Sequence, residues 1–299
     1  MSVAAPASDP DAASTRLGLQ LEQVVLKRLQ DDKLVLPTMP AVASKCLELV
    51  NKSDFNLNKI ASIIETDPVF AARILRTANS AGMATRSPAT NVQAAVVRLG
   101  QRNLRSLVLE ASLGGVFESR DRRIAEAARA IWNHSLAVAM LARDIGILVN
   151  VESEDCYLAG LLHDIGKPVL AVLLLEAEKQ IATRTSKPWI GSEAWMQCLQ
   201  RSHRVVGIAL ARQWQLPGLA ASAIEDQADY DNENRVSVGN VVRFSNAICK
   251  QQGLYVGAFD AEEVGAMVMI GRSLLQIEDD NLVRIVGGLK DKVAARLKT

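Results

Sequence analysis

The chain contains three histidines, and these are the residues best suited to carry chemistry. His163 is followed directly by Asp164, whereas His134 and His203 have no acidic neighbour in the sequence. Imidazole nitrogen together with carboxylate oxygen suits a divalent ion such as Mn²⁺, Fe²⁺ or Zn²⁺, which would polarise a phosphate and activate a water molecule. The alternative is that His163 and Asp164 form a hydrogen-bonded link between helices, since buried polar groups are normally paired. The residue types alone leave both interpretations open.

Helices must position these residues, because nearly every segment repeats apolar residues at the spacing of an amphipathic helix. With 49% hydrophobic and only 4% aromatic residues, the chain can bury a large core, and we expect an all-α fold. We expect each histidine near the end of its helix, with Gly166 ending one helix and Pro168 starting the next. Adjacent helical residues point about 100° apart, so His163 and Asp164 can share an ion only where other helices complete the shell.

Local signals place several helix boundaries in the first part of the chain. Asn56 is predicted to cap one helix, and Asp67, followed by Pro68, is predicted to cap the next. Gly100 is expected to break a helix that begins at Val92. These signals indicate short, well-punctuated helices before the first histidine.

The apolar pattern lapses around Gly114, Gly115 and the charged run 118–123, which predicts a boundary between two helical subdomains. The opening segment has small side chains and prolines, as is typical of a disordered tail. The expected organisation is a tail over 1–16, an N-terminal helical subdomain over 17–118, a second helical subdomain over 119–253 and a C-terminal helical extension over 254–299.

The string from Tyr157 to Lys167, which contains His163-Asp164-Ile165-Gly166-Lys167, resembles the HD superfamily of metal-dependent phosphohydrolases, with Asn133-His134-Ser135 upstream. Further segments resemble the HDOD domain, the HD-related output domain of bacterial signalling proteins: Leu36–Pro40, Ile63–Pro68, Arg73–Ser80, Ala94–Gly100, Ser202–Gly207 and Trp214–Pro217. The resemblance runs from about residue 34 to residue 253 and implies a multi-helix HD-like fold for the two subdomains.

The resemblance implies that His134, His163 and Asp164 occupy three metal-ligand positions and that Lys167 holds the place of a phosphate-facing lysine. Where catalytic relatives carry an aspartate in a later helix, this chain has Asn246. An amide is a neutral, weak ligand that cannot offset the charge of a cation, so the site is expected to be degenerate. His203 and Asp226 are the alternative extra ligands.

These features predict a bacterial signal-transduction output or adaptor protein of the cytoplasm, which acts by binding a signalling protein partner or a nucleotide. No residue is assigned a catalytic role, and Lys167 is the candidate if the chain is active. The alternative is a metal-dependent phosphohydrolase that acts on a nucleotide or a cyclic dinucleotide. The two interpretations differ in whether a metal is bound and substrate turned over.

A second cluster, formed by Arg98, Arg102 and Arg105, has helical spacing and would attract anions. The alternative is a solvated face or a set of links to nearby carboxylates, which the balance of 34 basic and 33 acidic residues favours. Aromatic residues for stacking on single-stranded nucleic acid are not interleaved with the cluster. Nucleic acid is therefore not an expected partner.

The four cysteines are widely spaced and form no CxxC pair, so we expect free buried thiols in a reducing compartment. The amino-terminal segment does not have the pattern of a secretory signal. The most apolar stretch, residues 168–175, is far shorter than the roughly 20 residues that span a bilayer. We therefore expect no membrane contact.

Overall fold

The computed structural model describes residues 10–52, 55–79, 88–117, 121–182, 191–216, 218–225 and 229–297 of the 299-residue chain. The described residues contain helices and no strand, which confirms the predicted all-α class. In chain order the helices are α1 (Pro10–Gln30), α2 (Ala41–Val50), α3 (Leu57–Ile64), α4 (Pro68–Ala78), α5 (Val92–Phe117), α6 (Arg122–Leu148), α7 (Ser153–Leu162), α8 (Gly166–Ala182), α9 (Ser192–Gln213), α10 (Gly218–Glu225), α11 (Val238–Gln251), α12 (Ala261–Leu274), α13 (Asp279–Val286) and α14 (Leu289–Leu297).

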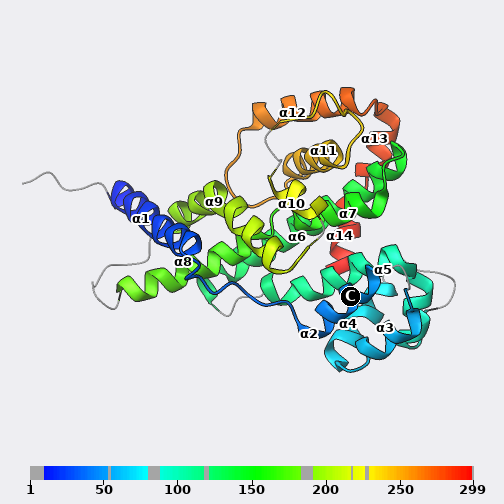
Figure 1. The fold of residues 1–299 in the computed structure, drawn as a ribbon. Coiled ribbons are helices and arrows are strands. Elements are labelled where there is room, and N and C mark those ends of the chain that lie inside the picture. Colours follow the sequence, from blue (N-terminus) through cyan, green and yellow to red (C-terminus); the bar gives the residue numbers. More distant parts are fainter. Residues whose placement is uncertain are drawn as a thin grey trace, which may run out of the picture.

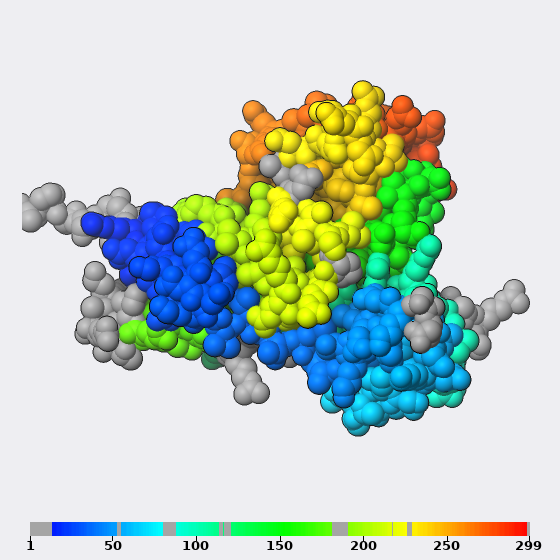
Figure 2. All heavy atoms as spheres, in the orientation of Figure 1, coloured from blue at the N-terminus to red at the C-terminus, as the bar shows by residue number. Residues whose placement is uncertain are grey.

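Helices α2–α5 form a lobe with its own apolar core, which is the blue and cyan mass in Figure 2. The predicted caps are confirmed, since the Asn56 side chain accepts a hydrogen bond from the backbone N–H of Lys59, and Asp67 caps α4. Gly100 has a φ of 65° and kinks α5, as expected for a residue without a Cβ. These local signals therefore predict the lobe's helix boundaries well.

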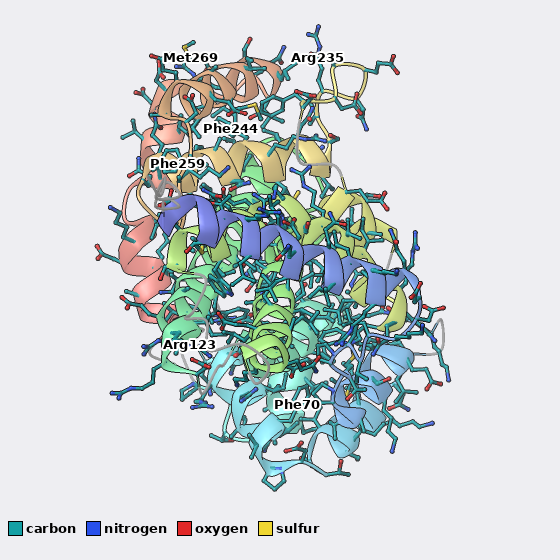
Figure 3. All side chains as sticks on the ribbon, turned by 90° about the vertical axis from the view of Figure 1, so that its left-hand side faces the viewer. Phe70, Arg123, Arg235, Phe244, Phe259 and Met269 are labelled. Carbon is teal, nitrogen blue, oxygen red and sulfur yellow. The ribbon has the colours of Figure 1, made fainter. Side chains whose placement is uncertain are left out.

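Helix α1 begins at Pro10 rather than at Leu17, because proline is favoured in a first helical turn and the alanines that follow are strong helix formers. Although we grouped it with the N-terminal subdomain, α1 packs on α8 and α9, away from the α2–α5 lobe (Figures 1 and 3). Its buried Leu21 and Val25 belong to the core of the larger half. The other predicted domain limits remain predictions.

The larger half of the molecule is built around α6 and α7, which pack on each other and separate two apolar cores. One core lies among α1 and α7–α10, and the other lies between α6 and α11–α14. The segment Ser153–Gln180 is long and apolar enough to span a membrane by composition, but 94% of its most apolar 18-residue stretch is buried inside the protein. It therefore forms the centre of the fold.

The junction between the lobe and the larger half contains a buried ion pair. Arg296 of α14 places Nη2 2.8 Å from Oε2 of Glu110 in α5, and both side chains are at most 9% exposed. The Tyr157 hydroxyl of α7 donates to the same carboxylate, and Arg296 also donates to the carbonyl of Thr77. Helix α14, red in Figure 1, thus ties the C-terminal extension to the lobe.

All four cysteines are free and buried, as predicted. Burial raises the pKa of the Cys198 thiol to about 11, so it stays protonated at neutral pH. The thiols therefore act as small apolar side chains.

Candidate metal centre

The three histidines come from three different helical elements. His163 and Asp164 lie in the turn that joins α7 to α8. The prediction that Gly166 ends a helix is wrong, because α7 ends at Leu162 and Gly166 is the first residue of α8, with Pro168 in the first turn of that helix. His134 and His203 lie in the middle of α6 and α9, so the prediction that each stands near a helix end is wrong for these two. Both helices continue because the residues directly after His134 and His203 include no glycine or proline that would end a helix.

Glycines at two crossings bring these elements into contact. A Cβ on Gly160 would lie 2.9 Å from the Cα of Ala139, so α7 approaches α6 more closely than a side chain would allow. A Cβ on Gly166 would lie 1.8 Å from the carbonyl oxygen of His203. The start of α8 therefore rests directly against the backbone of α9, and this contact holds His203 beside Asp164.

The imidazoles converge on the carboxylate of Asp164. Nε2 of His134 lies 3.6 Å and Nε2 of His163 lies 3.3 Å from Oδ2, while Nε2 of His203 lies 3.3 Å from Oδ1. None of the four residues is more than 5% exposed. Ligand atoms of His134, His163 and Asp164 all lie within 4.8 Å of one another, which is compatible with a shared ion.

Each ring is oriented by a backbone carbonyl at its other nitrogen. Nδ1 of His134 lies 2.6 Å from the oxygen of Leu254, and Nδ1 of His163 lies 2.7 Å from that of Gly160. Nδ1 of His203 lies 2.8 Å from the oxygen of Leu199. Because Nδ1 must donate in such contacts, the Nε2 lone pairs face inward.

This donor set fits a divalent cation. The buried Nε2 atoms of His134 and His203 have no hydrogen-bond partner, and a lone pair that faces a carboxylate is repelled unless a cation or proton lies between them. His134, His163, His203 and Asp164 would hold the ion, with nitrogen and oxygen donors that suit Mn²⁺, Fe²⁺ or Zn²⁺.

Lys167 supplies a positive charge from the protein itself. Its Nζ lies 2.6 Å from Oδ2 of Asp164, although the resemblance placed it toward a phosphate. Burial alone would raise the pKa of Asp164, but His163 and Lys167 outweigh it and hold that pKa well below its ordinary value. Burial would lower the pKa of Lys167, but the charge of Asp164 raises it above its ordinary value. The pair is therefore ionised inside the core.

Two further candidate ligands behave differently. Asn246 lies on α11 with its Oδ1 buried and without a hydrogen-bond partner, and it lines a cavity beside the cluster. Asp226 lies outside the described residues. Among the described residues, the carboxylate that lies together with His134 and His163 is that of Asp164.

Sequence reasoning missed Tyr255, which covers the cluster from the segment after α11. Its ring centroid lies 5.0 Å from that of His134, and Nζ of Lys167 lies 5.1 Å from the centroid of the same ring. No motif marks this residue, because its position depends on the path of a loop between two helices. The preceding Leu254 also supplies the carbonyl that orients His134.

The arginine cluster on α5 meets carboxylates near α7. Arg102 lies 2.5 Å from Glu152, and Arg105 lies 2.6 Å from Asp155. Arg98 contacts the Asn79 side chain. The first two contacts match the alternative of links to nearby carboxylates, and anion binding here remains a prediction.

A family model described as the HDOD domain matches residues 36–230, about two thirds of the chain. The chain belongs to the HDOD family. The match includes His134, the His163-Asp164 turn and His203, so the whole cluster lies inside the HDOD region.

Solved structures share the HDOD fold across most of this chain. A protein from Shewanella amazonensis SB2B, provisionally described as a metal-dependent phosphohydrolase, is 23% identical with a TM-score of 0.75, over 93% of this chain and 99% of that one. An HDOD domain protein of unknown function from Geobacter sulfurreducens is 20% identical with a TM-score of 0.62, over 93% and 98%. A protein from Marinobacter aquaeolei VT8, provisionally assigned to signal transduction, is 20% identical with a TM-score of 0.58, over 97% and 67%. At these identities the likeness shows the fold alone.

An uncharacterized protein from Treponema pallidum (strain Nichols) is 26% identical over 188 residues, which are 60% of this chain. The match spans 35% of the length of that relative. This chain therefore spans about a third of the length of that relative.

Proposed function

We propose that this HDOD protein is a non-catalytic output module of bacterial signal transduction. It acts in the cytoplasm by binding a signalling partner or a nucleotide, and its histidine–aspartate cluster holds the fold together. The observation that carries the proposal is the contact between Lys167 Nζ and Asp164 Oδ2 at 2.6 Å. The protein's own ammonium meets the oxygen that both His134 and His163 face.

The enclosure of the cluster supports the same function. Structural metal sites are closed by protein ligands, whereas catalytic sites keep a coordination position open to substrate. Here Asp164 is 2% exposed and Lys167 is 6% exposed, and the ring of Tyr255 lies against the cluster. Such a site crosslinks α6, the α7–α8 turn and α9, with or without an ion.

A second candidate, metal-dependent phosphohydrolysis, is favoured by the inward-facing Nε2 atoms. A bound divalent ion would polarise a phosphate ester and lower the pKa of a bound water. His134 and His203 would then be metal ligands, each oriented by the backbone carbonyl that its Nδ1 contacts. Lys167 would have to leave Asp164 to contact a phosphate. This candidate therefore requires a rearrangement of the buried pair.

Metal analysis combined with a phosphodiesterase assay tests the proposal. The purified chain, loaded in turn with Mn²⁺, Fe²⁺ and Zn²⁺, is given bis-p-nitrophenyl phosphate and a cyclic dinucleotide. We expect the same background rate for the wild type and for Asp164→Asn, His203→Gln and the control Asp280→Asn, which changes an exposed aspartate of α13. Metal-dependent turnover that survives in Asp280→Asn but is lost in both cluster variants would overturn the non-catalytic function.

A further inference from the structure

A cavity of about 570 Å³ lies beside the histidine–aspartate cluster and is lined in part by Tyr255, whose ring Lys167 also contacts. It is walled by α9, α11, α12 and the segment that joins α11 to α12. This volume falls within the range of roughly 300–1,000 Å³ that is typical of small-molecule sites. The residues that matter for its chemistry are Arg204, Asn246, Lys250, Tyr255, Phe259 and Glu263.

Three cations line this cavity, and two of them, Lys250 and Arg204, have no counter-ion among the described residues. Lys250 makes no hydrogen bond or ion pair there, and it lies over the ring of Tyr255, whose centroid is 5.1 Å from Nζ. The Nε of Arg204 is buried and has no hydrogen-bond partner. A half-buried ammonium beside a guanidinium is costly unless an anion joins them.

The electrostatics of Lys250 agree with this geometry. Burial lowers the pKa of Lys250, and the charge of Lys167 lowers it further. Asp164 and Glu263 oppose this shift without reversing it, and Arg204 adds a smaller lowering effect. An anion bound between Lys250 and Arg204 would relieve this repulsion.

The acidic residues of the cavity wall do not take that place. Asp260 caps α12, since its Oδ1 accepts hydrogen bonds from the backbone N–H groups of Glu262 and Glu263. Asp229 is exposed, and neither it nor Glu263 forms an ion pair with the two cations among the described residues. These carboxylates are instead placed to accept hydrogen bonds from hydroxyl or amino groups of a ligand.

The cavity also offers an aromatic wall. The rings of Tyr255 and Phe259 meet edge to face with centroids 5.9 Å apart, and Phe259 is 43% exposed. Figure 3 shows Phe259 at the edge of the molecule, below α12. An exposed aromatic face beside a cationic pocket is suited to stack a planar ring.

We infer that this cavity binds a nucleoside monophosphate, with the phosphate between Lys250 and Arg204 and the base against Phe259. The inference names a ligand for the binding role proposed above and rests on that role. Asn246, whose buried Oδ1 lacks a partner, accepts a hydrogen bond from the ligand. The phosphate lies in the cavity and not at Asp164, whose Oδ2 is in contact with Lys167, so the nucleotide is bound and not hydrolysed.

Calorimetric titration of the full chain in chelator-treated buffer tests this inference. The titrants are 5′-AMP and 5′-GMP, with ribose 5-phosphate and inorganic phosphate as probes that lack the base. We expect at least one nucleotide to bind more tightly than both base-free probes. Lys250→Met and Arg204→Gln should each weaken that binding by about tenfold or more, as for loss of a charge-assisted contact.

Matched controls are Lys45→Met and Arg129→Gln, which remove exposed cations far from the cavity lining and should leave nucleotide affinity unchanged. Phe259→Leu should weaken nucleotide binding but not phosphate binding, and thermal melting checks that each variant folds. Binding that is equal for nucleotide and inorganic phosphate, binding unaffected by both cation variants, or no binding at all would overturn the inference. None of these results involves turnover, so they leave the non-catalytic function to its own assay.

Discussion

Two lysines lie over the ring of Tyr255, each with Nζ 5.1 Å from the ring centroid, and they differ in what neutralises them. Lys167 is enclosed with Asp164 at 2.6 Å, whereas Lys250 faces a cavity without a carboxylate in contact. The enclosed lysine completes a structural cluster, and the open one is available to a ligand. Within one site, the presence of an internal counter-ion separates the residues that hold the fold from those that bind.

The largest effect should come from breaking the enclosed pair. Asp164→Asn or Lys167→Met alone leaves an uncompensated buried charge and should lower the free energy of unfolding by about 3–5 kcal/mol. The double variant Asp164→Asn/Lys167→Met should lose much less than the sum of the two. Urea denaturation in chelator-treated buffer measures this coupling, and strictly additive losses would mean that the two residues do not act as a pair.

A somewhat smaller loss should follow from separating the helices that enclose the pair. In Gly166→Ala the new Cβ meets the carbonyl oxygen of His203, so α8 and α9 must move apart. We expect a loss of about 1–3 kcal/mol in the same urea assay. Gly218→Ala is the control, because nothing lies within 4 Å of its Cβ, and it should be neutral. Equal stability of the two variants would show that the crossing is not tightly packed.

The enclosed cluster should also make stability depend on pH. Burial lowers the pKa of His134 from 6.5 to about 3, so the ring is neutral in the folded protein. Between these values the unfolded chain binds the extra proton. The contribution of neutral, buried His134 to the free energy of unfolding is therefore complete above pH 6.5. It is lost as the pH falls toward 3, at up to about 1.4 kcal/mol per pH unit.

Urea midpoints of the metal-free protein between pH 7 and pH 4 measure this slope. His134→Gln, whose amide can still donate to the Leu254 carbonyl, should flatten the curve relative to the wild type. An unchanged slope in the variant would assign the acid sensitivity to other groups.

The smallest effect should have the opposite sign and should come from the open lysine. Lys250→Met removes a desolvated cation without a counter-ion, so it should raise the free energy of unfolding by about 1 kcal/mol. Thermal melting at low ionic strength compares it with Lys167→Met, which should destabilise the protein. A loss of stability in both variants would erase the distinction between the two lysines.

The sequence predicts the helical class because apolar spacing and caps such as Asn56 and Asp67 are local signals. It also points to His134, His163 and Asp164, since the motif records which side chains gather. It does not show that Lys167 turns toward Asp164, because that contact depends on how far the cluster is closed to water. Burial of the cluster therefore decides whether Lys167 contacts a phosphate or the carboxylate of Asp164.

Other parts of the site could not be predicted for a related reason. Tyr255, Lys250 and Arg204 meet through the packing of α9, α11 and the loop before α12, and no spacing in the sequence records such a meeting. The packing of α1 on α8 and α9 is equally non-local. The apolar spacing of α1 predicts that one face is buried but does not indicate which half of the molecule buries it.

The pair between Arg296 and Glu110 has a practical consequence for dividing the molecule. The boundary near residue 118 suggests expressing the lobe and the larger half as separate fragments. A cut there would put the carboxylate of Glu110 in one piece and the guanidinium of Arg296 in the other. Each group would then lie on a surface that is buried in the intact protein. The hydroxyl of Tyr157 would leave with the larger piece, so the lobe alone would expose a carboxylate that had lost both of these partners. Fragments of this protein are therefore expected to be poor substitutes for the intact chain, and they would best be studied by mixing the two pieces.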